Sequence, residues 1–269
     1  MELITPLQEV TRPGHTPRTL ATLGVALLFA AIYLFGGRAN QRLGERGRRR
    51  FLSFAAGLAI SYTFVHILPG LHKIREFQTN SQSDYIQRLF PEYSVYLAAM
   101  LGFLVFYGLE SMVARPCGHA GNTGAHHGSA PPWQPWLHIG GFFLYTWLIT
   151  FLMVRTGKGL VGLGLFAVAL GLHIAPIANR LRSEYPDVYE HRGALLLASA
   201  CLAGWGCGLT LQIPAAVVAD MIAIVAGGVI VNAAIAELPK EREASYWSFV
   251  TGAVVYTALL LVLSHFEPH

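Results

Sequence analysis

Long apolar segments recur along this chain, and their length decides what it can fold into. A helix that crosses a bilayer needs about 20 largely apolar residues. Eight segments meet this requirement: 20–37, 51–71, 93–114, 137–154, 160–179, 193–212, 215–238 and 246–264. The fourth is only marginally apolar, and Pro214 alone divides the sixth from the seventh, so a count of seven stays open. We therefore expect an all-α integral membrane protein with about eight transmembrane helices.

Composition supports the same fold class. Of the 269 residues, 54% are hydrophobic and 13% are charged, whereas about 25% of the residues of soluble domains are charged. Soluble enzymes, nucleic-acid readers and disordered regulators are therefore excluded as leading classes. We expect the lipid bilayer to be a partner and nucleic acid not to be one.

Basic residues between the spans predict the orientation. The loop of residues 38–50 holds six arginines and one acidic residue, Glu45. With eight helices, the next basic loops, at Arg115, at residues 180–192 and at residues 240–242, fall on the same side. Cytoplasmic loops carry an excess of Lys and Arg. We expect a multi-pass protein of the inner cell membrane with both termini outside the cytoplasm.

The spans divide the chain into five segments. Residues 1–19 are predicted to be a polar N-terminal segment without the features of a cleavable signal peptide. Residues 20–114 hold the first three spans, residues 137–264 the other five, and residues 265–269 form a tail. Residues 115–136 are rich in Gly, Ser and Pro and are expected to form a flexible cytoplasmic loop with three histidines, His119, His126 and His127. These histidines either bind a metal loosely or are incidental to a polar linker.

Several polar residues fall inside the spans, where each needs a partner or a function. They are His66, His138, His173, Asn232 and Glu237. In two spans a histidine precedes a proline by three residues, as His66 before Pro69 and His173 before Pro176. A proline removes a helical hydrogen bond, and membrane proteins often interrupt helices where a substrate binds. The alternatives are helix breaks at a binding site and two ordinary proline kinks.

Three of these spans resemble the ZIP (Zrt-, Irt-like) family of divalent-metal transporters. The run ending in HILPG resembles the family's second helix, LHIAPIAN its fifth, and VAGGVIVNAAIAELPKE its seventh. The resemblance implies eight helices, no enzymatic activity, and transport of zinc, iron or manganese by alternating access, with zinc the first candidate. It implies metal contacts at His66, His138 and His173. Pro69, Pro176, Asn232 and Glu237 become candidates for the pathway or for helix breaks.

The chain departs from the family at the positions that hold the metal. Ile174 and Ile177 stand where the fifth helix of the family carries Glu and a second His, and the fourth span has Tyr145 at the depth of its motif. The alternative function is a non-transporting scaffold or regulatory membrane protein that has lost the binuclear metal site. An enzyme or haem protein is a third class, but Ser61 and His66 lack a third, orienting residue. Glycine runs such as GWGCG offer a seam through which we consider a homo-oligomer.

Overall fold

Helices form along the apolar stretches because hydrocarbon offers the backbone no hydrogen-bond partners, and a helix satisfies its own. The computed structural model describes residues 16–36, 44–73, 93–114, 131–156, 159–232 and 245–266. Within these ranges the regular secondary structure is helical, and no strand occurs. Large apolar side chains such as Leu104, Val254 and Leu259 lie on the outside, where lipid would cover them. The expected all-α membrane bundle is confirmed.

The helices follow one another along the chain, and residues outside the described ranges lie between several of them. They are α2 (Thr16–Ala31) with the π-helical turn η1 (Ile32–Gly36), α4 (Gly44–Tyr62) with the π-helical turn η2 (Thr63–Ile67), α7 (Ser94–Ala114), α8 (Gln134–Arg155), α9 (Leu160–Glu184), α10 (Pro186–Val188) with the π-helical turn η3 (Tyr189–Gly193), α11 (Ala194–Thr210), α12 (Ala215–Asn232) and α13 (Tyr246–Phe266). Seven helical runs in the described residues are long and apolar enough to cross a membrane, and the apolar part of α13 is a shorter eighth.

Several predicted boundaries are wrong at charged ends. Residues 44–50 belong to α4 rather than to the predicted loop, so the arginines there lie on its first turns. The fifth helix continues past the predicted end at residue 179 to Glu184, and it passes through Pro176 without the expected break. Long charged side chains reach the membrane surface from within a helix, so the charges do not mark its end. The second span also continues through Pro69 to Lys73, with η2 ending two residues before that proline, so neither proline interrupts its helix.

Close contacts at glycines join six of the helices into three pairs. The pairs and their glycines are α4 with α13 (Gly57, Gly252), α7 with α12 (Gly102, Gly227) and α8 with α11 (Gly204, Gly208). At Gly102, for example, a Cβ atom would overlap the backbone carbonyl of Ile224. Small residues allow such approach between membrane helices, where dispersion contacts replace the hydrophobic effect.

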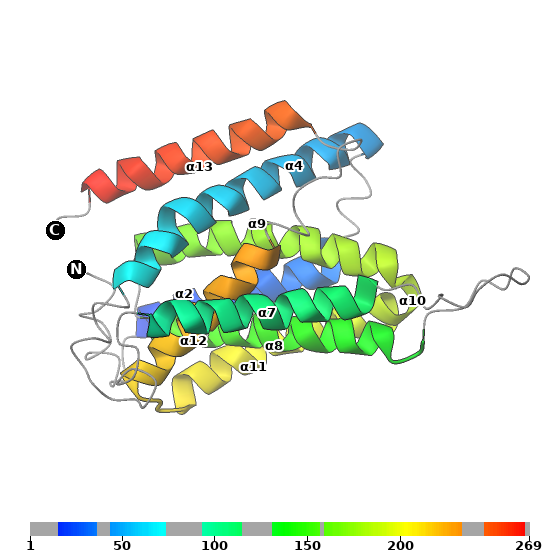
Figure 1. Ribbon diagram of the computed structural model, residues 1–269, viewed down its shortest axis with the longest axis horizontal. Helices are drawn as coiled ribbons and strands as arrows, with labels where there is room; N and C mark the ends of the chain where they lie inside the picture. Colours follow the sequence, from blue (N-terminus) through cyan, green and yellow to red (C-terminus); the bar gives the residue numbers. More distant parts are fainter. Residues whose placement is uncertain are drawn as a thin grey trace, which may run out of the picture.

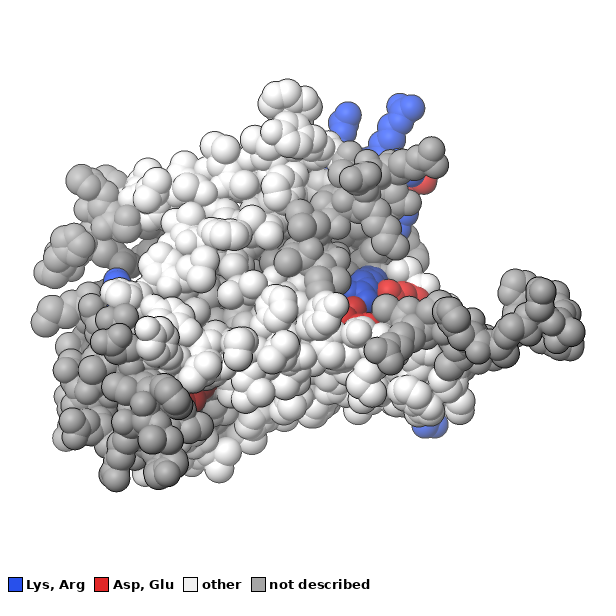
Figure 2. All heavy atoms as spheres, in the orientation of Figure 1, with Lys and Arg blue, Asp and Glu red and all other residues white. Residues whose placement is uncertain are grey.

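The helix α9 packs mainly against α4 and against α2 with η1, and the visible charges lie mostly at one end of the bundle. Figure 1 shows α4 and α13 side by side, with α9 beneath α4 and α7, α8, α11 and α12 beyond it. Figure 2 shows that the charged side chains visible on this face lie mostly toward one end, while the middle is uncharged. The core is mainly apolar, with large buried side chains such as Phe142, Phe151 and Tyr145.

Replacing Gly102 tests the close approach of α7 and α12. We expect Gly102→Ala to lower the free energy of unfolding by about 1–3 kcal/mol, the usual cost of overpacking a core. The matched control is Gly108→Ala on the same helix, because a Cβ there meets no atom within 4 Å. We expect that control to be neutral or slightly stabilising, since alanine is the better helix former. Thermal unfolding of both variants in detergent measures the difference, and equal melting temperatures would contradict the account.

Candidate functional site

Tyr145 and His173 form a hydrogen-bonded pair at the centre of the bundle. Tyr145 comes from α8 and His173 from α9, and the Tyr145 hydroxyl lies 2.9 Å from Nε2 of His173. The two side chains are 0% and 2% exposed. The rings of Phe106 and Phe142 meet the edge of Tyr145. The imidazole that the sequence singles out as a metal ligand therefore contacts a phenol, and we name these two residues the central pair.

The neighbours of His173 on α9 supply no further ligands. Ile174 and Ile177 are fully buried in the apolar core. Both belong to the same large cluster as Phe29 and Leu181. A divalent ion at the central pair would therefore meet hydrocarbon where an acidic or imidazole side chain would be needed, and hydrocarbon does not compensate a buried charge.

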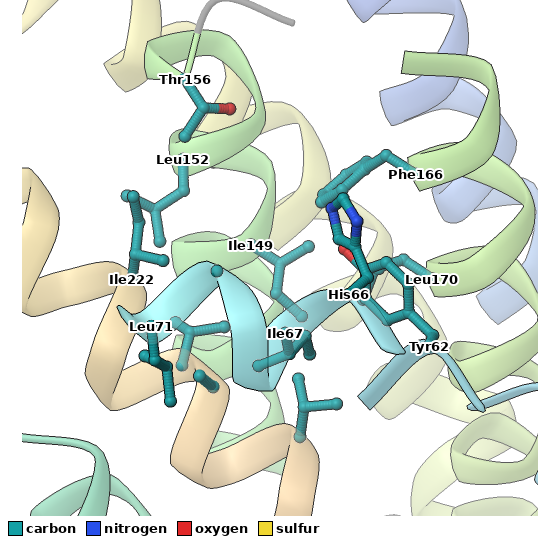
Figure 3. A pocket seen from close by; sticks show the side chains of 14 residues that line it. Tyr62, His66, Ile67, Leu71, Ile149, Leu152, Thr156, Phe166, Leu170 and Ile222 are labelled. Carbon is teal, nitrogen blue, oxygen red and sulfur yellow. The ribbon is translucent and has the colours of Figure 1, made fainter. Parts of the chain in front are cut away.

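His66 lies beside a cavity at one end of the bundle, which we call the cavity end. The cavity has a volume of about 100 Å³ and lies between α4 with η2, α8, α9 and α12. The ring of His66 stacks on that of Tyr62 with centroids 5.1 Å apart. Figure 3 shows both side chains near Phe166 and Leu170, across the cavity from Leu152 and Ile222. His66 thus faces open space, whereas the predicted ligands His138 and His173 are buried.

His138 belongs to an ionic cluster of four residues at the opposite end of the bundle, the ionic end. Glu110 comes from α7, His138 from α8, and Arg180 and Glu184 from α9. The guanidinium of Arg180 donates to both carboxylate oxygens of Glu110, at 2.9 and 2.5 Å, and to Glu184 at 2.8 Å. The imidazole of His138 is fully buried and lies 3.3 Å from Glu110 and 3.5 Å from Glu184.

This cluster already contains its cation. A forked guanidinium on a carboxylate is among the strongest charge-assisted contacts that side chains make. Arg180 donates to oxygens of Glu110 and of Glu184 at once, so its positive charge partly compensates both carboxylates. His138 lies in the first turns of α8 and is a fully buried member of the cluster. The cluster links α7, α8 and α9 where no glycine contact joins α9 to them.

Asn232 lies one helical turn beyond Gly228, where α12 contacts Phe106 and Tyr145. Its amide is 1% exposed, and neither polar atom has a hydrogen-bond partner within the described residues. Buried amides without partners are costly, so Asn232 stays a candidate pathway residue.

The predicted ligands are not brought together into one site. His66 lies at the cavity, His173 in the central pair and His138 in the ionic cluster. No group of three or more His, Cys, Asp or Glu side chains able to hold a metal ion occurs among the residues that the structure describes. Pro69 is exposed next to η2, and Pro176 lies half-buried inside α9. Glu237 and the loop histidines His119, His126 and His127 lie outside the described residues.

Sequence comparison provides no assignment. No protein-family model matches the chain, and no characterised protein matches its sequence. The features that bear on function are therefore three regions at successive heights along the bundle, which we call the three polar levels: the cavity with His66, the central pair, and the ionic cluster.

Neutralising Glu110 tests the ionic cluster. Glu110→Gln leaves the guanidinium of Arg180 with a weakened partner in a largely buried place, and breaking such a pair costs about 3 kcal/mol. The matched control is Glu45→Gln, whose ion pair with Arg49 is exposed and worth at most about 1 kcal/mol. Denaturation in detergent, followed by helical circular dichroism, compares the two. An equal loss of stability in both variants would show that the cluster does not hold the helices together.

Proposed function

We propose that this chain is a transport protein of ZIP-like architecture, which moves a divalent metal ion, zinc first among the candidates, across the inner cell membrane by alternating access. One observation carries the proposal: the three polar levels follow one another along the same helices. On α8 the order is Ile149 at the cavity, Tyr145 and His138. At 1.5 Å per residue, Tyr145 lies about 6 Å beyond Ile149 and His138 about 10 Å further.

The other helices support the same order. On α9, Leu170 lines the cavity, His173 belongs to the central pair, and Arg180 belongs to the ionic cluster. On α12, Val229 lines the cavity and the buried Asn232 follows three residues later. Polar groups inside a membrane bundle are by default candidates for an ion or substrate path. A line of them through an otherwise apolar core supports a route from one end to the other.

Charge supports an orientation for this route. The first turns of α4 carry Arg46, Arg48, Arg49 and Arg50. The part of α4 that reaches the cavity lies at its other end, so these arginines belong to the ionic end together with Arg180 and Arg182. Because cytoplasmic ends carry the excess of Lys and Arg, the ionic end faces the cytoplasm in this proposal and the cavity faces outward. Both chain ends are then outside.

Each level has a role in the proposed transport. His66 offers an imidazole to the arriving ion at the outer cavity. The central pair closes the route in the conformation described, and rotation of Tyr145 away from His173 frees Nε2 as a ligand. Zinc sites in proteins usually have four ligands and the neighbours of His173 on α9 supply none, so in this proposal His173 contacts a hydrated ion in passage and does not hold it in a resident site. The ionic cluster forms the inner gate, where the ion competes with Arg180 for Glu110 and Glu184.

A second candidate function is a non-transporting scaffold or regulatory membrane protein. The hydrogen bond between Tyr145 and His173 favours it, because the bond occupies the one imidazole that the fifth span keeps. The buried positions of Ile174 and Ile177 favour it too. In this reading the central pair is an interhelical contact that holds α8 against α9.

Metal uptake by reconstituted protein distinguishes the two candidates. Purified protein in liposomes that hold a zinc-sensitive dye is given external Zn²⁺, with Mn²⁺ and Fe²⁺ in parallel. We expect uptake above that of empty liposomes. His173→Ala should reduce it by about tenfold or more, the size of effect seen when a group that supports metal binding is lost.

The matched control replaces an exposed histidine outside the route. His191→Ala removes an imidazole that contacts only the backbone carbonyl of Asp187 among the contacts described, and uptake should be unchanged. Folded protein that takes up no metal ion would contradict the transport proposal and favour the non-transporting scaffold. Uptake that is equal in His173→Ala and the parent would remove His173 from the route.

A further inference from the structure

The cavity offers an ion the imidazole of His66 and little else, so most of its lining is suited to an apolar ligand. Of the 14 residues that line it, only Tyr62, His66 and Thr156 carry a polar side-chain atom, and the others are aliphatic, aromatic or Gly70. A bare ion in such surroundings loses its hydration with little in return. The walls formed by Ile149, Leu152, Leu170, Val225 and Val229 instead favour contact with a carbon chain.

Thr156 supplies one hydrogen-bonding group inside this apolar space. It follows α8 directly, and its backbone N–H donates to the carbonyl of Leu152. Its side chain is 9% exposed, and its hydroxyl has no hydrogen-bond partner within the described residues. Figure 3 shows the Thr156 oxygen turned to the side on which Phe166 lies. Leaving a buried hydroxyl without a partner is costly, and a ligand with a matching group recovers part of that cost.

Size and polarity together define the ligand. A cavity of about 150 Å³ lined by Leu, Ile and Phe takes up benzene, so a volume of about 100 Å³ suits about four to six non-hydrogen atoms by that comparison. Water is a poor occupant near Thr156, because a buried water needs two to four polar partners. We propose that the cavity binds a small uncharged amphiphile, an alcohol-like molecule whose hydroxyl contacts Thr156 and whose carbon chain contacts the apolar walls.

The position of the cavity predicts how such a ligand would affect metal uptake. Ile149 lies one turn from Tyr145, and Leu170 lies one turn from His173, so an occupant sits directly over the central pair. It would block the outer mouth of the proposed route and inhibit uptake. This consequence rests on the proposed function, whereas binding itself rests only on the cavity.

Photolabelling tests binding without reference to transport. The protein in nanodiscs is irradiated with a diazirine derivative of propanol, and with the matching diazirine alkane, and labelled residues are identified by mass spectrometry. We expect labels on lining residues of α4, α8, α9 and α12, and competition by unlabelled propanol. Thr156→Val keeps the side-chain shape and should reduce labelling by the alcohol about fivefold, the effect of one lost hydrogen bond. Labelling by the alkane should stay unchanged.

The second variant fills the cavity with a larger side chain. Gly70 lines the cavity, and a Cβ there meets no atom within 4 Å, so Gly70→Leu should place a side chain in the space and abolish labelling by both probes. Gly164→Leu is the matched control, because Gly164 is also unobstructed but is not a lining residue. Both variants are first checked for an unchanged melting temperature. If Gly70→Leu does not fold, labelling of Thr156→Val alone tests the binding proposal.

The outcomes separate this inference from the transport proposal. Labels on lining residues no stronger than on the lipid-facing residues Leu104 and Val254 would overturn the inference, and so would equal labelling of Thr156→Val by the alcohol. Specific labelling together with an absence of metal uptake would support the ligand site and refute transport alone. Where uptake occurs, propanol should inhibit it in the parent, and Gly70→Leu, whose side chain fills the same space, should reduce uptake without propanol.

Discussion

The close approach of helix backbones at glycines is the constraint on which the rest of the bundle depends. Hydrocarbon provides no hydrophobic drive for one apolar helix to leave lipid and join another, so contact area must supply the attraction. Gly102 allows the backbone of α7 to meet α12, and Gly57 and Gly204 do the same for the other two pairs. The helix α9 instead packs through large apolar side chains such as Ile174 and Leu181, and it also makes polar contacts with its neighbours. The Glu110–Arg180 ion pair and the Tyr145–His173 hydrogen bond are two of them.

This division explains why the polar side chains lie where they do. Each of the three levels involves α9 with a partner from another helix, so a rearrangement of α9 changes all three at once. A bundle with rigid pairs and one polar-bonded helix has the parts that alternating access requires, namely bodies that keep their shape and contacts that exchange. The same polar bonds in a static protein would simply fix α9 in place. The apolar cavity above the central pair is compatible with both readings, and it adds a site for an uncharged ligand.

The helices could be predicted from the sequence because about 20 apolar residues have few alternatives in a membrane chain. Their ends were less predictable, since charged residues such as Arg180 continue α9 rather than end it. The departure at Ile174 and Ile177 was visible in the sequence, and the structure describes both as core residues. No pattern predicted that Tyr145 contacts His173 or that Glu110 pairs with Arg180, because each bond joins residues far apart in the chain through the packing of the helices. The cavity was equally hidden, as it arises from the gap that four helices leave.

Two separate polar regions, the cavity with His66 and the ionic end, should open to opposite sides of the membrane. The reaction of single cysteines with a membrane-impermeant maleimide tests this arrangement most directly, in a variant whose three cysteines are replaced by alanine. His66→Cys should react only with reagent added outside, and Ser183→Cys, beside the ionic cluster on α9, only with reagent added on the cytoplasmic side. Reaction of both cysteines from the same side would contradict the account.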